Sequence, residues 1–280
     1  MIHLVTVATH SERYLPVLDQ QSKDKNMTLV KLAVGKKYTG HFMKDLEMLD
    51  YLKSSSVNDE DIVVFVDGFD TLLLANKKEI IEKFKSFDCD ILLSIENVGS
   101  LSFIHSAVFQ KVKGKFINTG LYMGYAKALK DFLQEMYTQE FDKSSNQKTW
   151  ANYLEKKNDY SRIALDSNSD IFLNYSFTTT NKIISKNKRV YLDESVPCFI
   201  QGNGCEDLSK IIKNTGYKDY DIHNDKRTFK VIENNLKAVL HIYPIIALYI
   251  SLIIFVIIII SLFIYNIYKN YKDKHFYIYL

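Results

Sequence analysis

Apolar residues in the first 200 positions form short β-branched runs that alternate with stretches of helical spacing. The runs predict strands at His3–Ala8, Met27–Val34, Asp61–Val66, Cys89–Ser94, Phe116–Tyr125, Val190–Leu192 and Cys198–Ile200. The helical spacings predict helices at Phe42–Lys53, Asn76–Phe87, Ala126–Tyr137 and Asn146–Lys156. Asp61–Val66 reads DIVVFV, which is typical of a central strand covered on both faces. The alternation predicts an α/β domain with a mostly parallel sheet.

The C-terminal part of the chain has a different pattern. Ile245 to Tyr265 carries no charge, and at about 1.5 Å per residue this run reaches roughly 31 Å, enough to cross the hydrocarbon core of a bilayer. Tyrosines lie at both ends and lysines follow Tyr268, as expected at membrane interfaces. A buried core helix is the alternative, but Leu252–Ile260 is apolar on every side. We therefore expect one transmembrane helix.

These patterns divide the chain into four parts. We expect an α/β domain over 1–216, a polar juxtamembrane linker over 217–241, a transmembrane helix over 242–268 and a short basic and aromatic tail over 269–280. Met1–His10 lacks the basic start of a secretory signal. A chain whose hydrophobic segment is C-terminal inserts late, so we expect a single-pass membrane protein with its α/β domain in the cytosol.

The charge balance and the cysteine count limit the possible binding partners and disulfides. The 280 residues include 36 basic and 33 acidic ones, and this near-balance argues against a nucleic-acid partner. Cys89, Cys198 and Cys205 are too few for a disulfide framework and are expected as free thiols, although Cys198 and Cys205 have a spacing that permits a pair across a turn.

The clearest chemical signal is Asp67-Gly68-Phe69-Asp70, directly after the predicted central strand. Ligands of α/β sheets bind outside the carboxyl ends of the strands. Carboxylate oxygens there suit Mn²⁺ or Mg²⁺, and a bound diphosphate completes the coordination. A solvated turn with a helix cap is the alternative interpretation of two aspartates at this spacing.

Two glycine-containing segments add further candidates. In Ile117-Asn118-Thr119-Gly120, the glycine permits close approach of a sugar, or else marks a strand bulge. In Gln201-Gly202-Asn203-Gly204, backbone N–H groups after a short strand are suited to phosphate, while a tight hairpin turn is the alternative.

Several segments, in register, resemble the glycosyltransferase domain of procollagen-lysine hydroxylase/glycosyltransferases. The resemblance runs from about Leu4 to Tyr217 and includes Leu4–Thr9, Phe65–Asp70, Leu93–Glu96, Phe116–Gly120, Leu165-Asp166 with Ile171-Phe172, and Gly202–Gly204. It implies a GT-A-type, Rossmann-like fold, a UDP-glucose or UDP-galactose donor, Mn²⁺ (or Mg²⁺), and a hydroxylysine acceptor in a collagen-like protein. The hydroxylase domain of that family is absent from this sequence.

The resemblance also implies roles for individual residues. Asp67 and Asp70 would bind the metal, with Gln201 as the candidate third ligand, and Thr6 and Phe69 would hold the uridine. Two residues, Asn118 and Asp166, would line the sugar and acceptor side as catalytic candidates. Gly202, Asn203 and Gly204 would contact the donor.

This chain departs from the family pattern at three places. Gln201 replaces a metal-binding histidine, Ser144–Gln147 stands where the family has a run of aspartates before a glutamine, and Glu206-Asp207 replaces a lysine expected at the diphosphate. A neutral amide oxygen is a weaker ligand for Mn²⁺ than imidazole. The sequence thus leaves two hypotheses: a metal-dependent glycosyltransferase, or a catalytically degenerate, membrane-tethered binding or scaffold protein. A structural membrane protein without a ligand would leave the ordered motifs unexplained.

Overall fold

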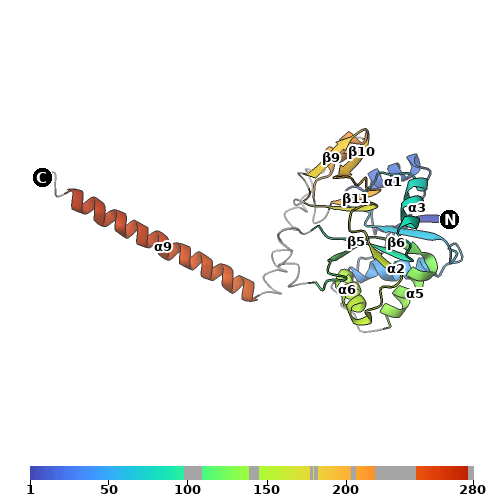
Figure 1. The fold of residues 1–280 in the computed structure, drawn as a ribbon, viewed down its shortest axis with the longest axis horizontal. Coiled ribbons are helices and arrows are strands. Elements are labelled where there is room, and N and C mark those ends of the chain that lie inside the picture. The colour runs from blue at the N-terminus through green and yellow to red at the C-terminus, as the bar shows by residue number, and fades with distance from the viewer. Residues whose placement is uncertain are drawn as a thin grey trace. The chain divides into compact units, whose positions relative to one another are not determined.

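The computed structural model describes residues 1–97, 109–138, 145–176, 179, 182–202, 206–217 and 244–276. The chain divides into two compact units, Met1–His223 and Asn224–Leu280. Figure 1 shows the first as a layered α/β body, and the described part of the second, Pro244–Phe276, as a long helix.

The first unit is built on a central sheet, which in the described residues has six strands in the order β2-β1-β3-β6-β5-β7. In that order the bounds are Leu29–Leu32, Ile2–Val7, Ile62–Val66, Ile117–Tyr125, Ile91–Ile95 and Ile163–Leu165. Neighbouring strands run parallel, except that β6 is antiparallel to both β3 and β5. The α/β fold with a mostly parallel sheet is confirmed, and the GT-A-type expectation agrees with this architecture.

Both faces of this sheet are covered by helices, as the apolar strands require (Figure 1). Along β3, Ile62, Val64 and Val66 point to one face and Val63 and Phe65 to the other. The first face packs against α1 (Leu15–Asp24) and α3 (Lys77–Ser86). The second packs against α2 (Phe42–Leu52), α5 (Ala126–Met136) and α6 (Asn146–Lys157).

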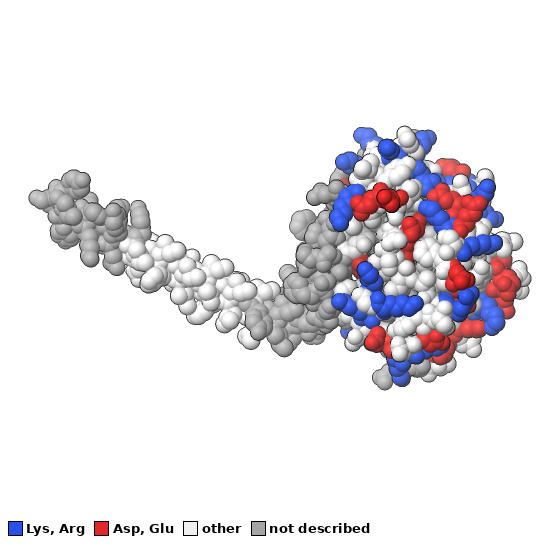
Figure 2. Space-filling view, viewed as in Figure 1, with Lys and Arg blue, Asp and Glu red and all other residues white. Residues whose placement is uncertain are grey.

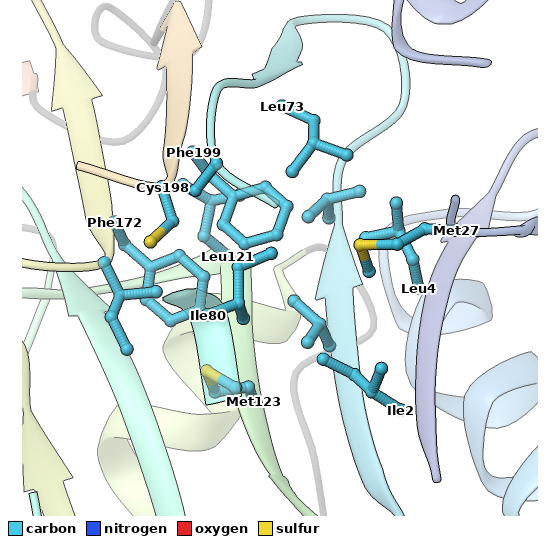
Figure 3. Packing of buried hydrophobic residues seen from close by; sticks show 14 of the residues in the cluster. Ile2, Leu4, Met27, Leu73, Ile80, Leu121, Met123, Phe172, Cys198 and Phe199 are labelled. Carbon is cyan, nitrogen blue, oxygen red and sulfur yellow. The ribbon is translucent and has the colours of Figure 1, made fainter. Parts of the chain in front are cut away.

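A smaller sheet, in the order β4-β11-β8, lies beside the first face of the central sheet. Its strands are Thr71–Leu73, Phe199–Gly202 and Phe172–Tyr175. Figure 3 shows Leu73, Phe172 and Phe199 of this sheet packed around Leu121 of β6. Burial of these side chains fixes the small sheet against the central one, and with it the position of Gln201.

The remaining described elements of the first unit are peripheral. A hairpin of β9 (Ile183–Lys186) and β10 (Arg189–Leu192) and the short helix α7 (Ser209–Asn214) share a third apolar cluster with the small sheet. On the face shown in Figure 2, lysine and arginine are interspersed with aspartate and glutamate. Cys89 and Cys198 are free and buried, while Cys205 lies outside the described residues.

The second unit contains helix α9, Pro244–Phe276. Its window Ile250–Ile267 has a mean hydropathy of 2.9 and no buried residues, so the helix is long and apolar enough to cross a membrane. The helix continues beyond Tyr268, where the sequence predicted a tail. Most of the predicted linker lies outside the described residues.

Candidate functional site

Asp67 and Asp70 lie in the short connection from β3 to β4, at the carboxyl end of the central sheet. The Asp67 N–H donates to the Gly120 carbonyl on β6 at 2.8 Å, and the Gly202 N–H donates to the Asp70 carbonyl at 2.8 Å. These two bonds fix the connection to one strand of each sheet. Both carboxylates therefore face the place where the two sheets meet.

Gln201 of β11 completes the group from the small sheet. Its Nε2 donates to Asp67 Oδ2 at 3.3 Å and to Asp70 Oδ1 and Oδ2 at 3.2 and 3.3 Å. The side chain is 3% exposed. The structure thus brings together the three residues that the sequence predicted as metal ligands, with the amide nitrogen between the carboxylates.

These residues fit a hard divalent cation. Two carboxylates and an amide oxygen are ligands of the kind that Mg²⁺, Ca²⁺ and Mn²⁺ accept. Gln201 Oε1 is buried and has no hydrogen-bond partner among the described residues, so an oxygen ligand is available there. The space depends on Gly120, because a Cβ at that position would clash with Gln201 Nε2 and lie 2.8 Å from Asp67 Oδ2. The described residues contain no group of three His, Cys, Asp or Glu side chains able to hold a metal. A cation at this place would therefore depend on the Gln201 amide oxygen as its third protein ligand.

Asp67 and Asp70 differ in the charged groups that surround them. Lys44 of α2 forms an ion pair with Asp67 Oδ1 at 2.5 Å. Burial lowers the pKa of Lys44, but the charge of Asp67 and this hydrogen bond outweigh burial and raise it. Burial, followed by the charge of Asp67, raises the pKa of Asp70 to about 7, against the opposing effects of Lys44 and Gln201. Asp67 is therefore paired with the positive charge of Lys44, whereas Asp70 lacks a comparable counter-charge.

Asn118 joins this site to the end of β5. Its Nδ2 donates to Glu96 Oε1 at 2.7 Å, and its Oδ1 accepts from the Gly120 N–H at 2.7 Å. Burial raises the pKa of Glu96 to about 7, against hydrogen bonds from Asn118 and Gln147. Asn118 therefore holds the Gly120 backbone next to the carboxylates, beside a second acidic side chain.

Two functional-site residues, Lys44 and Glu96, were not among the predicted site residues. Glu96 follows a predicted strand, so the strand-end rule that selected Asp67 also pointed to it. Lys44 lies on a helix and is brought to Asp67 by tertiary packing, for which the sequence gives no local signal.

The predicted uridine contacts lie on the neighbouring strand end and loop. Thr6 on β1 is fully buried, and a Cβ on Gly68 would lie 2.7 Å from its Oγ1. The Phe69 ring is partly buried, with its centroid 5.2 Å from that of His10. Their roles toward a base stay predictions.

Asp166, predicted to line the sugar side, has extensive backbone contacts. It is fully buried, and its carboxylate accepts from the N–H groups of Asp170, Ile171 and Phe172 at 2.8, 2.9 and 2.6 Å. The side chain therefore closes the connection between β7 and β8, and a catalytic role stays a prediction.

Of the predicted donor-binding glycines, Gly202 is buried in β11, where a Cβ would lie 2.9 Å from the Glu206 carbonyl. Asn203 and Gly204 lie outside the described residues.

The comparisons with known proteins agree with this geometry. A family model described as the PLOD GT domain matches residues 1–220, most of the 280-residue chain. The chain belongs to the PLOD glycosyltransferase-domain family. The first unit is thus a glycosyltransferase domain.

Two procollagen-lysine enzymes are similar to this PLOD-type domain. Procollagen-lysine,2-oxoglutarate 5-dioxygenase 1 of Gallus gallus is 26% identical over 176 residues, covering 60% of this chain and 24% of that protein. The Drosophila melanogaster procollagen-lysine,2-oxoglutarate 5-dioxygenase is 29% identical over 153 residues, covering 46% and 21%. The chain therefore spans less than a quarter of the length of these relatives.

Two solved structures are also similar to the PLOD-type domain. A glycosyltransferase involved in glycosylation of the major capsid of PBCV-1 has 12% identity and a TM-score of 0.48, covering 73% of this chain and 96% of that one. The galactosyltransferase LgtC, solved with donor and acceptor sugar analogues, has 11% identity and a TM-score of 0.41, covering 77% and 95%. The family assignment rests on the family model.

The segment where the PLOD resemblance leads us to expect aspartates has a structural role in this chain. Ser145 caps α6 by accepting from the Lys148 N–H at 3.3 Å. Asn146 is buried, donates to Asp45 at 3.3 Å, and accepts from Thr119 Oγ1 at 3.3 Å. Neutral side chains here tie α6 to β6 next to Gly120.

Proposed function

We propose that this chain is a metal-dependent glycosyltransferase that transfers a hexose from UDP-glucose or UDP-galactose. The observation that carries the proposal is the convergence of Asp67, Asp70 and Gln201 at the sheet end of a PLOD-type glycosyltransferase domain. An oxygen-lined group at this place suits a cation that binds a nucleoside diphosphate.

In this proposal the chain's own residues bind and orient the donor. Asp67, Asp70 and Gln201 would hold Mn²⁺ or Mg²⁺, which when bound offsets the negative charge of the departing diphosphate. Lys44 orients Asp67 through its ion pair. Thr6 and Phe69 would hold the uridine, Gly202, Asn203 and Gly204 the diphosphate, and Asn118 and Asp166 the sugar side.

For the acceptor, we propose a hydroxylysine-bearing, collagen-like protein. The support is the names of the two relatives, which refer to procollagen lysine. The chain matches 24% and 21% of the length of these relatives.

Turnover by the full-length protein in detergent tests the proposal. We expect hexose release from UDP-glucose or UDP-galactose that EDTA abolishes and Mn²⁺ restores, and that Asp70→Ala removes. Asp50→Ala, on the exposed side of α2, is the matched control and should retain activity. Turnover that persists in EDTA and in Asp70→Ala would contradict the metal-dependent reaction.

A degenerate binding module is the second candidate, because Gln201 and Asn146 stand where the resemblance leads us to expect histidine and aspartate. It predicts UDP binding without turnover of any UDP-hexose. A structural protein without a ligand predicts no UDP binding at all.

We also propose that helix α9 anchors the domain to a membrane and that the domain faces the cytosol. The support for the anchor is the apolar window Ile250–Ile267, which has the length and composition of a bilayer span.

A further inference from the structure

Three polar side chains form a row across the small sheet, beside the carboxylates. Gln201 on β11 pairs with Thr71 on β4 and with Asn174 on β8 in the strand register. Directly paired residues project to the same face of a sheet, with Cβ atoms roughly 5 Å apart. All three side chains are buried, being 0% (Thr71), 3% (Gln201) and 1% (Asn174) exposed.

Each member of the row has a buried oxygen without a hydrogen-bond partner among the described residues. These atoms are Thr71 Oγ1, Gln201 Oε1 and Asn174 Oδ1. A buried polar atom without a partner destabilises the folded state, so three neighbouring ones need an explanation. The two amide oxygens only accept hydrogen bonds, whereas the Thr71 hydroxyl can donate or accept and does neither among the described residues.

The amide orientations are determined by their partners. Gln201 Nε2 donates to the carboxyl groups of Asp67 and Asp70. Asn174 Nδ2 donates to the Ile95 carbonyl at 2.6 Å and to Ser94 Oγ, so its Oδ1 is directed elsewhere. Without a cation, Gln201 thus places its NH₂ between the carboxylates and leaves its own oxygen unused.

A cation between Asp67 and Asp70 would reverse the requirement, because it needs the Gln201 oxygen and repels the NH₂ dipole. We propose that Gln201 turns its amide when a divalent cation binds, and that Thr71 Oγ1 and Asn174 Oδ1 then accept its NH₂. Thr71 and Asn174 are positioning residues for the ion ligand. The proposal rests on the proposed function, in which Asp67 and Asp70 hold the ion.

The rotation gives each of the three oxygens in the row a partner. The Gln201 oxygen meets the ion, its NH₂ meets two acceptors, and Asn174 is already held by β5. Partners behind a metal ligand orient it, and their loss typically costs 10–100-fold in metal affinity. By holding the Gln201 amide, Thr71 and Asn174 would recover part of the ion affinity that a neutral amide ligand lacks.

Thr71 offers the cleaner test, since Asn174 also has structural hydrogen bonds. Thr71→Val removes the hydroxyl and nearly keeps the shape, whereas Thr71→Ser keeps the hydroxyl. In the full-length protein with UDP present, we expect Thr71→Val to weaken Mn²⁺ binding about tenfold in an EPR titration. Thr71→Ser should bind like the wild type. Without Mn²⁺, Thr71→Val should unfold at or above the wild-type temperature, because the hydroxyl has no partner in that state.

A double-mutant cycle separates this role from a change of shape. In Gln201→Ala there is no amide to hold, so adding Thr71→Val should cause no further loss of Mn²⁺ affinity. Equal losses in both backgrounds would overturn the proposal.

Asp70→Ala distinguishes this proposal from the proposed function. If Asp70→Ala abolishes Mn²⁺ binding and Thr71→Val leaves it unchanged, the ion site stands and the rotation is wrong. If Asp70→Ala leaves Mn²⁺ binding unchanged, the ion site itself fails, and the rotation with it.

Discussion

Gln201 offers an ion a neutral oxygen, whereas a histidine at the same place would offer an imidazole nitrogen. Imidazole suits transition metals, while carboxylate and amide oxygens suit hard ions such as Mg²⁺ as well as Mn²⁺. We expect Gln201→His to raise the affinity for Mn²⁺ by more than it raises the affinity for Mg²⁺. Titration of both ions into both proteins with UDP present measures this difference. A weaker or equal Mn²⁺ response in the histidine variant would mean that residue 201 does not face the ion.

Asp45 of α2 is a buried carboxyl that receives hydrogen bonds from Tyr137 Oη at 2.7 Å and Trp150 Nε1 at 2.8 Å. Burial raises its pKa to about 6 from an ordinary 3.8, although these bonds, Asn146 and Lys44 oppose the shift. The folded state thus binds the proton more tightly than the unfolded state. The contribution of Asp45 to the free energy of unfolding is therefore greatest below about pH 4 and falls, by on the order of 3 kcal/mol, as pH rises to about 6.

Asp45→Asn should remove this part of the pH dependence, because an amide keeps an acceptor for Tyr137 and Trp150 and does not ionise. Urea unfolding of both proteins between pH 4 and 7 gives the difference, in which the other titrating carboxyls cancel. Parallel stability curves for the two proteins would show that Asp45 is not the buried acid described above.

Among single residues, the sequence predicted three ion-ligand candidates that the structure brings together, but not the residues around them. Asp67 and Asp70 directly follow a recognisable strand, so the rule for strand ends selected them, whereas Gln201 was implied by the resemblance to the procollagen-lysine family. Lys44 is different, because its partner Asp67 comes from another element and only the packing of α2 on the sheet brings them together.

The order of helices and strands was predictable where each has its own periodic pattern. The short strands β4, β7 and β8 were not predicted as strands, since three or four residues give little periodicity and depend on pairing with neighbours. Helix α1 was also missed: Pro16 stands in its first turn, and the buried Gln21 and Ser22 interrupt its apolar stripe. Whether these segments form strands or a helix depends on tertiary contacts.

The connection from β7 to β8 depends on Asp166, which accepts three backbone N–H groups. In Asp166→Asn, the Nδ2 replaces one acceptor oxygen and faces a donor. We expect the free energy of unfolding to fall by about 1–3 kcal/mol. Chemical denaturation measures this loss. An Asp166→Asn variant with wild-type stability and lost turnover would instead assign Asp166 to catalysis.

The chain as a whole joins a glycosyltransferase domain to a helix able to span a membrane. Two N-glycosylation sequons, Asn26-Met27-Thr28 and Asn174-Tyr175-Ser176, can report on which side of the membrane the domain lies. Asn174 is buried and its Nδ2 is hydrogen-bonded, so a glycan there conflicts with the fold. Asn26 is exposed and is the informative site.

With the domain in the cytosol, we expect no glycan on Asn26 in a eukaryotic host. A glycosidase-induced mobility shift on a gel measures this, with a sequon added after Leu280 as the positive control. A shift that disappears in Asn26→Gln would place the domain in the secretory lumen, where a secreted collagen-like acceptor could reach it.

Calorimetric titration of UDP into the full-length protein, with and without Mn²⁺, tests the proposed ion site most directly. Diphosphate alone meets like charge at Asp67 and Asp70, so we expect UDP to bind at least about tenfold more tightly with Mn²⁺, and this gain to be lost in Asp70→Ala. The same Mn²⁺-dependent gain in Asp70→Ala as in the wild type would contradict an ion held by Asp67, Asp70 and Gln201.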